Sequence, residues 1–75
     1  MTQLEQRMLS AATAGLGSLV AELHRFRDEG GTALDAERVL EEIRKEATDE
    51  IEDVILEGLD FVVGFCAPEK KIWRS

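Results

Sequence analysis

The chain of 75 residues has no tyrosine and only one cysteine, one proline, one tryptophan and one histidine. A single cysteine excludes an intrachain disulfide and a zinc site built from paired cysteines, and it is typical of a reducing compartment. Basic residues are outnumbered by acidic ones. The chain has nine Lys and Arg and sixteen Asp and Glu, which gives a formal net charge of −7. Neutralising phosphates requires clustered cations, so we expect no direct binding to nucleic acid.

Long hydrophobic runs are missing as well. The most apolar stretch is interrupted by Glu57 and Asp60, and it is too short to span a bilayer. The first residues, MTQLEQRMLS, contain no basic region followed by an apolar run, so no signal peptide is expected. Hydrophobic residues nevertheless make up 44% of the chain and charged residues 33%, which is typical of a folded domain. We therefore expect a small cytoplasmic protein with no membrane partner.

The first part of the chain predicts a helix over residues 2–28. Thr2 and Glu5 have the spacing of a capping box, which satisfies free backbone donors at a helix start. Apolar residues then recur on one helical face: Leu9, Ala12, Leu16, Leu19, Leu23 and Phe26. Gly15 and Gly17 each cost roughly 1 kcal/mol in a helix relative to alanine. Either the helix breaks there or another helix approaches closely, and we favour a continuous helix.

The glycine pair at 30–31 predicts a corner before a second helix over residues 35–66. Asp35 is the favoured N-cap of this helix, and Thr32 is a rival N-cap. Apolar or small residues recur along one face at positions 40, 43, 47, 51, 54, 58, 62 and 65. Pro68 is expected to end the helix because it lacks a backbone N–H.

These two long helices predict an all-α, antiparallel helical hairpin over residues 1–67, followed by a basic tail over residues 68–75. The second helix is the longer one, so its apolar end would extend beyond the hairpin and need cover from another chain. Two hairpins that dimerise into a four-helix bundle would provide that cover. The predicted oligomer interface comprises Leu56, Leu59, Phe61, Val62, Val63, Phe65 and Cys66.

The second helix carries most of the negative charge, since residues 32–67 hold eleven acids and three bases. Five of the acids follow a helical spacing and predict one acidic stripe: Glu46, Glu50, Asp53, Glu57 and Asp60. The stripe is a solvated face, a docking surface for a protein with a basic surface, or a mimic of nucleic acid that blocks a basic groove. Binding of a divalent metal is a further alternative.

The metal alternative has a specific form. Glu50-x-x-Asp53, followed by an apolar helix, resembles the second acidic motif of MazG-type nucleotide pyrophosphohydrolases. The resemblance implies carboxylates that hold Mg²⁺ against the phosphates of a nucleotide. It covers only part of the second helix. The family also has an earlier Glu-x-x-Glu on a facing helix, and the first helix here offers only Glu5 and Glu22, which do not form that pair.

The tail combines cations with an aromatic residue: Lys70, Lys71, Trp73 and Arg74. It either anchors at an acidic protein surface, where Trp and Arg are enriched, or frays. His24 and Cys66 have no neighbours that suggest catalysis, and we expect structural roles for both. We therefore predict a small regulatory or interaction protein that self-associates, binds a basic protein, and has no catalytic residue, metal or cofactor.

Overall fold

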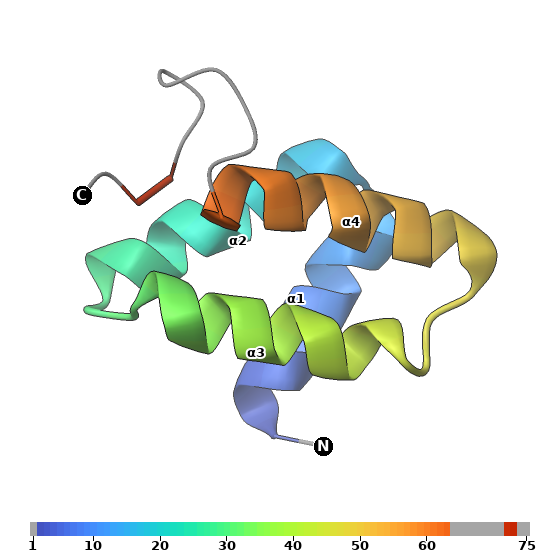
Figure 1. Cartoon of the computed structure of the whole chain (residues 1–75), viewed down its shortest axis with the longest axis horizontal. Helices are drawn as coiled ribbons and strands as arrows, with labels where there is room; N and C mark the ends of the chain where they lie inside the picture. Colours follow the sequence, from blue (N-terminus) through green and yellow to red (C-terminus); the bar gives the residue numbers. More distant parts are fainter. Residues whose placement is uncertain (1, 64–71, 74–75) are drawn as a thin grey trace.

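The computed structural model describes residues 2–63 and 72–73, and this part of the chain folds into four helices (Figure 1). They are α1 (Gln3–Ala14), α2 (Leu16–Asp28), α3 (Ala33–Arg44) and α4 (Asp49–Val63). No strand occurs among the described residues. The expected all-α class is thus confirmed. The expected pair of long helices is wrong, because each of them breaks near its middle and the chain turns back on itself.

The first break lies at Gly15, so the predicted continuous helix over residues 2–28 does not form. Gly15 has φ 131° and ψ 171°, a conformation that glycine adopts and other residues avoid. Its N–H donates to the carbonyls of Ala11 and Ala12 at 3.2 Å, and its own carbonyl accepts from the N–H of Leu19 at 3.0 Å. The same residue therefore ends α1 and begins α2.

The helix caps agree in part with the sequence patterns. Thr2 and Glu5 form the predicted capping box: the Thr2 hydroxyl accepts from the Glu5 N–H at 3.1 Å, and the Glu5 carboxylate accepts from the Thr2 N–H at 3.3 Å. At the start of α3, Thr32 accepts from the N–H of Asp35 at 3.1 Å. The rival prediction of Thr32 as N-cap is confirmed, and Asp35 instead lies in the first turn, where a carboxylate favours the helix dipole.

The second break separates α3 from α4 at residues 45–48. The carbonyl of Thr48 accepts from the N–H of Glu52 at 2.8 Å and so starts α4. Arg44 forms an ion pair with Glu52 at 3.3 Å, although these residues are 8 positions apart. In one continuous helix they would be separated by about 12 Å along the axis. This pair is therefore possible only because the chain reverses between the two helices.

All four helices contribute to one core. Its buried hydrophobic residues are Met8, Ala12, Leu19, Leu23, Ala36, Leu40, Ile43, Ile55, Leu59, Val62 and Ile72. α1 packs mainly against α2 and α3, and α4 packs mainly against the same two helices. The packing of α2 against α4 leaves no room for a side chain at Gly58, since a Cβ at this position would lie 2.6 Å from Cδ2 of Leu19.

The predicted apolar overhang does not form in the described residues, because four short helices replace the two-helix hairpin. Val62 is 6% exposed within the single chain, and Phe61 is half-buried. The N–H of Ile72 donates to the Phe61 carbonyl at 3.2 Å, and Ile72 is fully buried. Phe65 and Cys66, two other members of the predicted interface, lie outside the described residues, as does Pro68.

Candidate interaction surface

The charged side chains of α4 are all acidic, with six Asp and Glu and no Lys or Arg over Asp49–Val63. Four members of the predicted stripe are exposed on this helix: Glu50, Asp53, Glu57 and Asp60. We call these four residues the acidic face of α4. Glu46 is also exposed, but it lies in the connection before α4 and therefore outside the helix that carries the others. The structure thus keeps a shorter stripe than the sequence predicts.

In the described residues, no carboxylate of the acidic face forms an ion pair. Within residues 2–63 and 72–73, the ion pairs engage six other acids: Glu22, Asp28, Glu29, Glu41, Glu42 and Glu52. Like charges three or four positions apart on a helix cost a few tenths of a kcal/mol per pair. Glu50 lies in the first turn, where a carboxylate favours the helix dipole, but the repulsion among the acids further along α4 is not offset by an ion pair in the described part of the chain.

Two exposed apolar side chains border the acidic face. Leu56 is 36% exposed and Val63 is 40% exposed, and Leu34 on α3 is the other exposed large hydrophobic residue described. At about 100° of rotation per residue, Leu56 and Val63 lie on the same side of α4, within about 60° of Asp60. We call Leu56 and Val63 the apolar pair. Of the predicted interface residues that the structure describes, this pair is exposed, Phe61 is half-buried, and Leu59 and Val62 are buried in the core.

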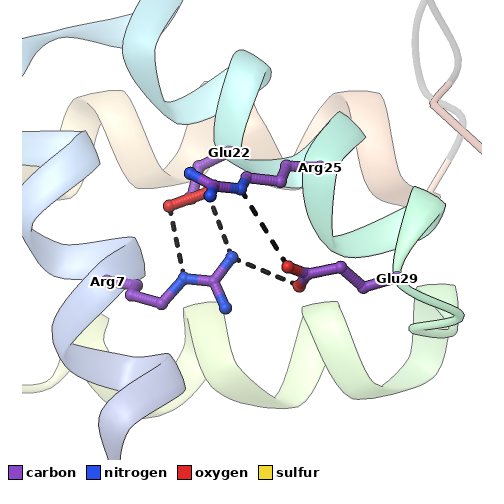
Figure 2. Close-up of polar contacts among 4 residues, drawn as sticks. All are labelled: Arg7, Glu22, Arg25 and Glu29. Atoms are coloured by element: carbon purple, nitrogen blue, oxygen red, sulfur yellow. Dashed lines mark hydrogen bonds and ion pairs between the residues drawn. The ribbon is translucent and has the colours of Figure 1, made fainter.

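A separate polar cluster joins α1 to α2 (Figure 2). Arg7 donates from Nε and Nη2 to the two carboxylate oxygens of Glu22 at 3.4 and 3.3 Å, and from Nη2 to Glu29 at 3.3 Å. Arg25 lies 4.0 Å from the other oxygen of Glu29. The hydrogen bonds to Glu22 raise the pKa of Arg7 above its ordinary value, and this effect exceeds the opposing desolvation. The cluster links α1 to α2 through the Arg7 guanidinium, which stays positively charged at any physiological pH.

Sequence patterns did not reveal this cluster. Arg7 is 15 positions from Glu22 and 22 positions from Glu29, so neither pair matches a helical spacing. Only the turn at Gly15 brings them together. A prediction of the break would have made the contacts foreseeable, because α2 would then fold back beside α1.

The described part of the tail docks on its own chain. The indole Nε1 of Trp73 donates to the carbonyl of Gly31 at 2.9 Å, and its ring meets Phe26 edge-on at a centroid distance of 6.2 Å. Arg27 donates to the carbonyl of Ile72 at 2.8 Å. Trp73 therefore contacts Phe26 of α2 and the corner at Gly31. The other predicted anchor residues lie outside the described residues: Lys70, Lys71 and Arg74.

The structure brings no metal-binding set together in its described residues: no group of three or more His, Cys, Asp or Glu is placed to hold an ion. Glu50 and Asp53 both belong to the exposed acidic face. Glu5 is engaged in the capping box, and Glu22 is engaged by Arg7. His24 is half-buried on α2. The resemblance to the nucleotide hydrolases thus remains an untested prediction from a short motif.

Comparison with known proteins found no matching family model, no matching curated protein and no matching solved structure. Among the helices of the described residues, none has the length and the apolar character needed to cross a membrane. A function must therefore be inferred from the chemistry of the surfaces themselves. The acidic face of α4, with the apolar pair beside it, is the candidate site.

Proposed function

We propose that this protein is a small interaction module and that the outer side of α4 docks a basic, amphipathic segment of a partner protein. The observation that supports this proposal is a juxtaposition on one helix. Exposed carboxylates without ion pairs to the described cations lie beside two exposed apolar side chains. Neither feature contributes to the core of the described chain, and together they match a helix that carries cations along one edge of an apolar stripe.

The two parts of this surface would contribute differently to binding. Removing Leu56 and Val63 from water stabilises a complex by roughly 25 cal/mol for each Å² of apolar area buried. The acidic face accelerates encounter with a basic partner and excludes acidic ones, while adding less to net affinity. Affinity for the correct partner would therefore depend mainly on the apolar pair, whereas a charge reversed within the acidic face would weaken binding because it replaces an attraction by a repulsion.

Two other occupants fit the surface less well. A second copy that paired symmetrically through α4 would set one acidic face against another, and close like charges cost several kcal/mol at an interface. A mimic of nucleic acid would act through the carboxylates alone and would leave the apolar pair without a role. A basic amphipathic helix uses both features, and it is therefore the occupant that we propose.

The test measures binding of a synthetic helical peptide that presents Lys and Leu on adjacent faces, with a scrambled peptide of the same composition as control. We expect the ordered peptide to bind more tightly than the scrambled one by fluorescence anisotropy. Glu57→Lys should weaken binding about tenfold, which corresponds to about 1.4 kcal/mol. The matched variant is Glu46→Lys, which reverses another exposed acid outside α4 and should have a much smaller effect.

Three results would contradict the proposal. Equal binding of the ordered and scrambled peptides would leave only a general attraction between opposite charges. Equal effects of Glu57→Lys and Glu46→Lys would remove α4 as the site. Sedimentation of the chain alone tests self-association: a dimer that dissociates in Leu56→Ser would assign the apolar pair to a second copy. Circular dichroism of each variant checks that the helices remain folded.

A further inference from the structure

A second apolar surface lies away from α4, in an open groove of about 500 Å³ between α1, the end of α2 and α3. Three half-buried side chains provide its apolar wall: Leu4, Phe26 and Val39. All three pack against the buried core on one side. The groove therefore presents apolar area on a rigid support, and α4 contributes no residue to its lining.

Neighbouring residues restrain the Phe26 ring in this wall. The ring of Phe26 meets Trp73 edge-on and occupies the space where a side chain at residue 31 would be, which only glycine leaves open. Trp73 is in turn fixed by its hydrogen bond to the carbonyl of Gly31. A side chain restrained in this way loses little conformational freedom when a ligand binds, which favours affinity.

Charged side chains surround the apolar wall: Glu5, Asp35, Glu42 and Arg38. The lining residues carry three negative charges and one positive charge, a balance of −2 (−3 + 1), and Glu42 also pairs with Lys45, which lies outside the lining. This balance repels phosphates and acidic peptides and favours a ligand that places cations around an inserted apolar group. The groove is thus complementary in charge and in polarity to a basic segment with a large apolar residue.

We propose that this groove is a second docking site of the protein, for a peptide segment that inserts one large apolar side chain between Leu4, Phe26 and Val39 and places Lys or Arg against Asp35 and Glu42. The proposal does not depend on the acidic face of α4, because the two sites share no residue. The chain's own Ile72 and Trp73 are not the occupant. Ile72 is fully buried in its own core, and Trp73 is hydrogen-bonded to Gly31.

Nuclear magnetic resonance provides the test, with uniformly ¹⁵N-labelled protein and a short synthetic peptide that carries one Leu between Lys residues. Two matched peptides replace the Leu by Ser or the Lys residues by Glu. We expect the first peptide to shift the amide signals of Leu4, Phe26 and Val39, and either replacement to weaken binding about tenfold. Shifts confined to α4 would overturn this proposal while leaving the proposed function intact, and an absence of shifts would overturn it as well.

α3 offers a matched pair of protein variants. Glu42 lines the groove and pairs with Lys45 at 3.3 Å, whereas its neighbour Glu41 does not line the groove and pairs with Arg44 at 3.5 Å. Glu42→Lys and Glu41→Lys therefore make the same charge change on the same helix and each break a surface ion pair. We expect Glu42→Lys to weaken peptide binding about tenfold and Glu41→Lys to leave it near the parent value. Equal losses in the two variants would contradict the groove site.

Discussion

The indole nitrogen of Trp73 donates a hydrogen bond to the main-chain carbonyl of Gly31 at 2.9 Å, across 42 positions of sequence. This contact ties residue 73 to the corner between α2 and α3 and sets the Trp73 ring against Phe26. The corner depends on two glycines for different reasons. Gly30 adopts φ 95°, and Gly31 leaves room for the Phe26 ring. The end of the chain thus helps to fix a turn near its middle.

We expect Trp73→Phe to lower the free energy of unfolding by about 0.5–1.5 kcal/mol, because phenylalanine keeps an aromatic ring beside Phe26 but cannot donate to Gly31. Trp73→Ala should cost more, since it removes the ring as well. Urea denaturation followed by circular dichroism measures both, because the chain has no second tryptophan for fluorescence. A Trp73→Phe variant as stable as the parent would show that the hydrogen bond contributes nothing net.

Replacing either of two helical glycines by a larger residue should change the stability of the protein, in opposite directions at the two positions. A Cβ at Gly58 meets the fully buried side chain of Leu19, so Gly58→Val should overpack the α2–α4 contact and destabilise the fold by about 1–3 kcal/mol. A Cβ at Gly17 meets nothing within 4 Å. Gly17→Ala should therefore stabilise α2 by up to about 1 kcal/mol. Thermal denaturation measures the change in stability of each variant, and a change of the same sign in both would contradict tight packing at Gly58 and open space at Gly17.

Neutralising part of the acidic face should stabilise the protein. The double variant Asp53→Asn, Glu57→Gln removes a repulsion between positions four apart, and we expect a gain of a few tenths of a kcal/mol at low salt that shrinks at high salt. Glu41→Gln is the control, because it removes a favourable ion pair with Arg44 and should not raise the stability of the protein. A loss of stability in the double variant would mean that these carboxylates serve the fold.

Local patterns predicted several features correctly. The spacing of Thr2 and Glu5 indicated the capping box, and the glycine pair at 30–31 indicated the end of a helix. Apolar periodicity identified core positions such as Leu23 and Leu40, which are fully buried. These features depend on residues within one or two turns of each other, so the sequence contains the information needed to predict them.

The acidic face could also be predicted as a surface, since a helical spacing of carboxylates requires no knowledge of neighbouring helices. The apolar border of this face, in contrast, could not be predicted from the sequence. The sequence pattern predicts one interface that contains Leu56, Leu59, Val62 and Val63. Only the packing of α4 against α2 and α3 decides that Leu59 and Val62 are buried. The groove beside Phe26 could not be predicted either, because its lining residues come from three different helices that only the tertiary fold brings together.

The sequence alone determined that this chain is helical, where its first cap lies, and which turns carry negative charge, because these properties follow from backbone preferences and short-range spacing. The tertiary structure decided where the helices break. The apolar positions on either side of residues 45–48 stay in helical phase, so one long helix and two short ones satisfy the same pattern. The two short helices bury Ile43 and Ile55 in one core and bring Arg44 to Glu52. Those contacts exist only once the chain has reversed.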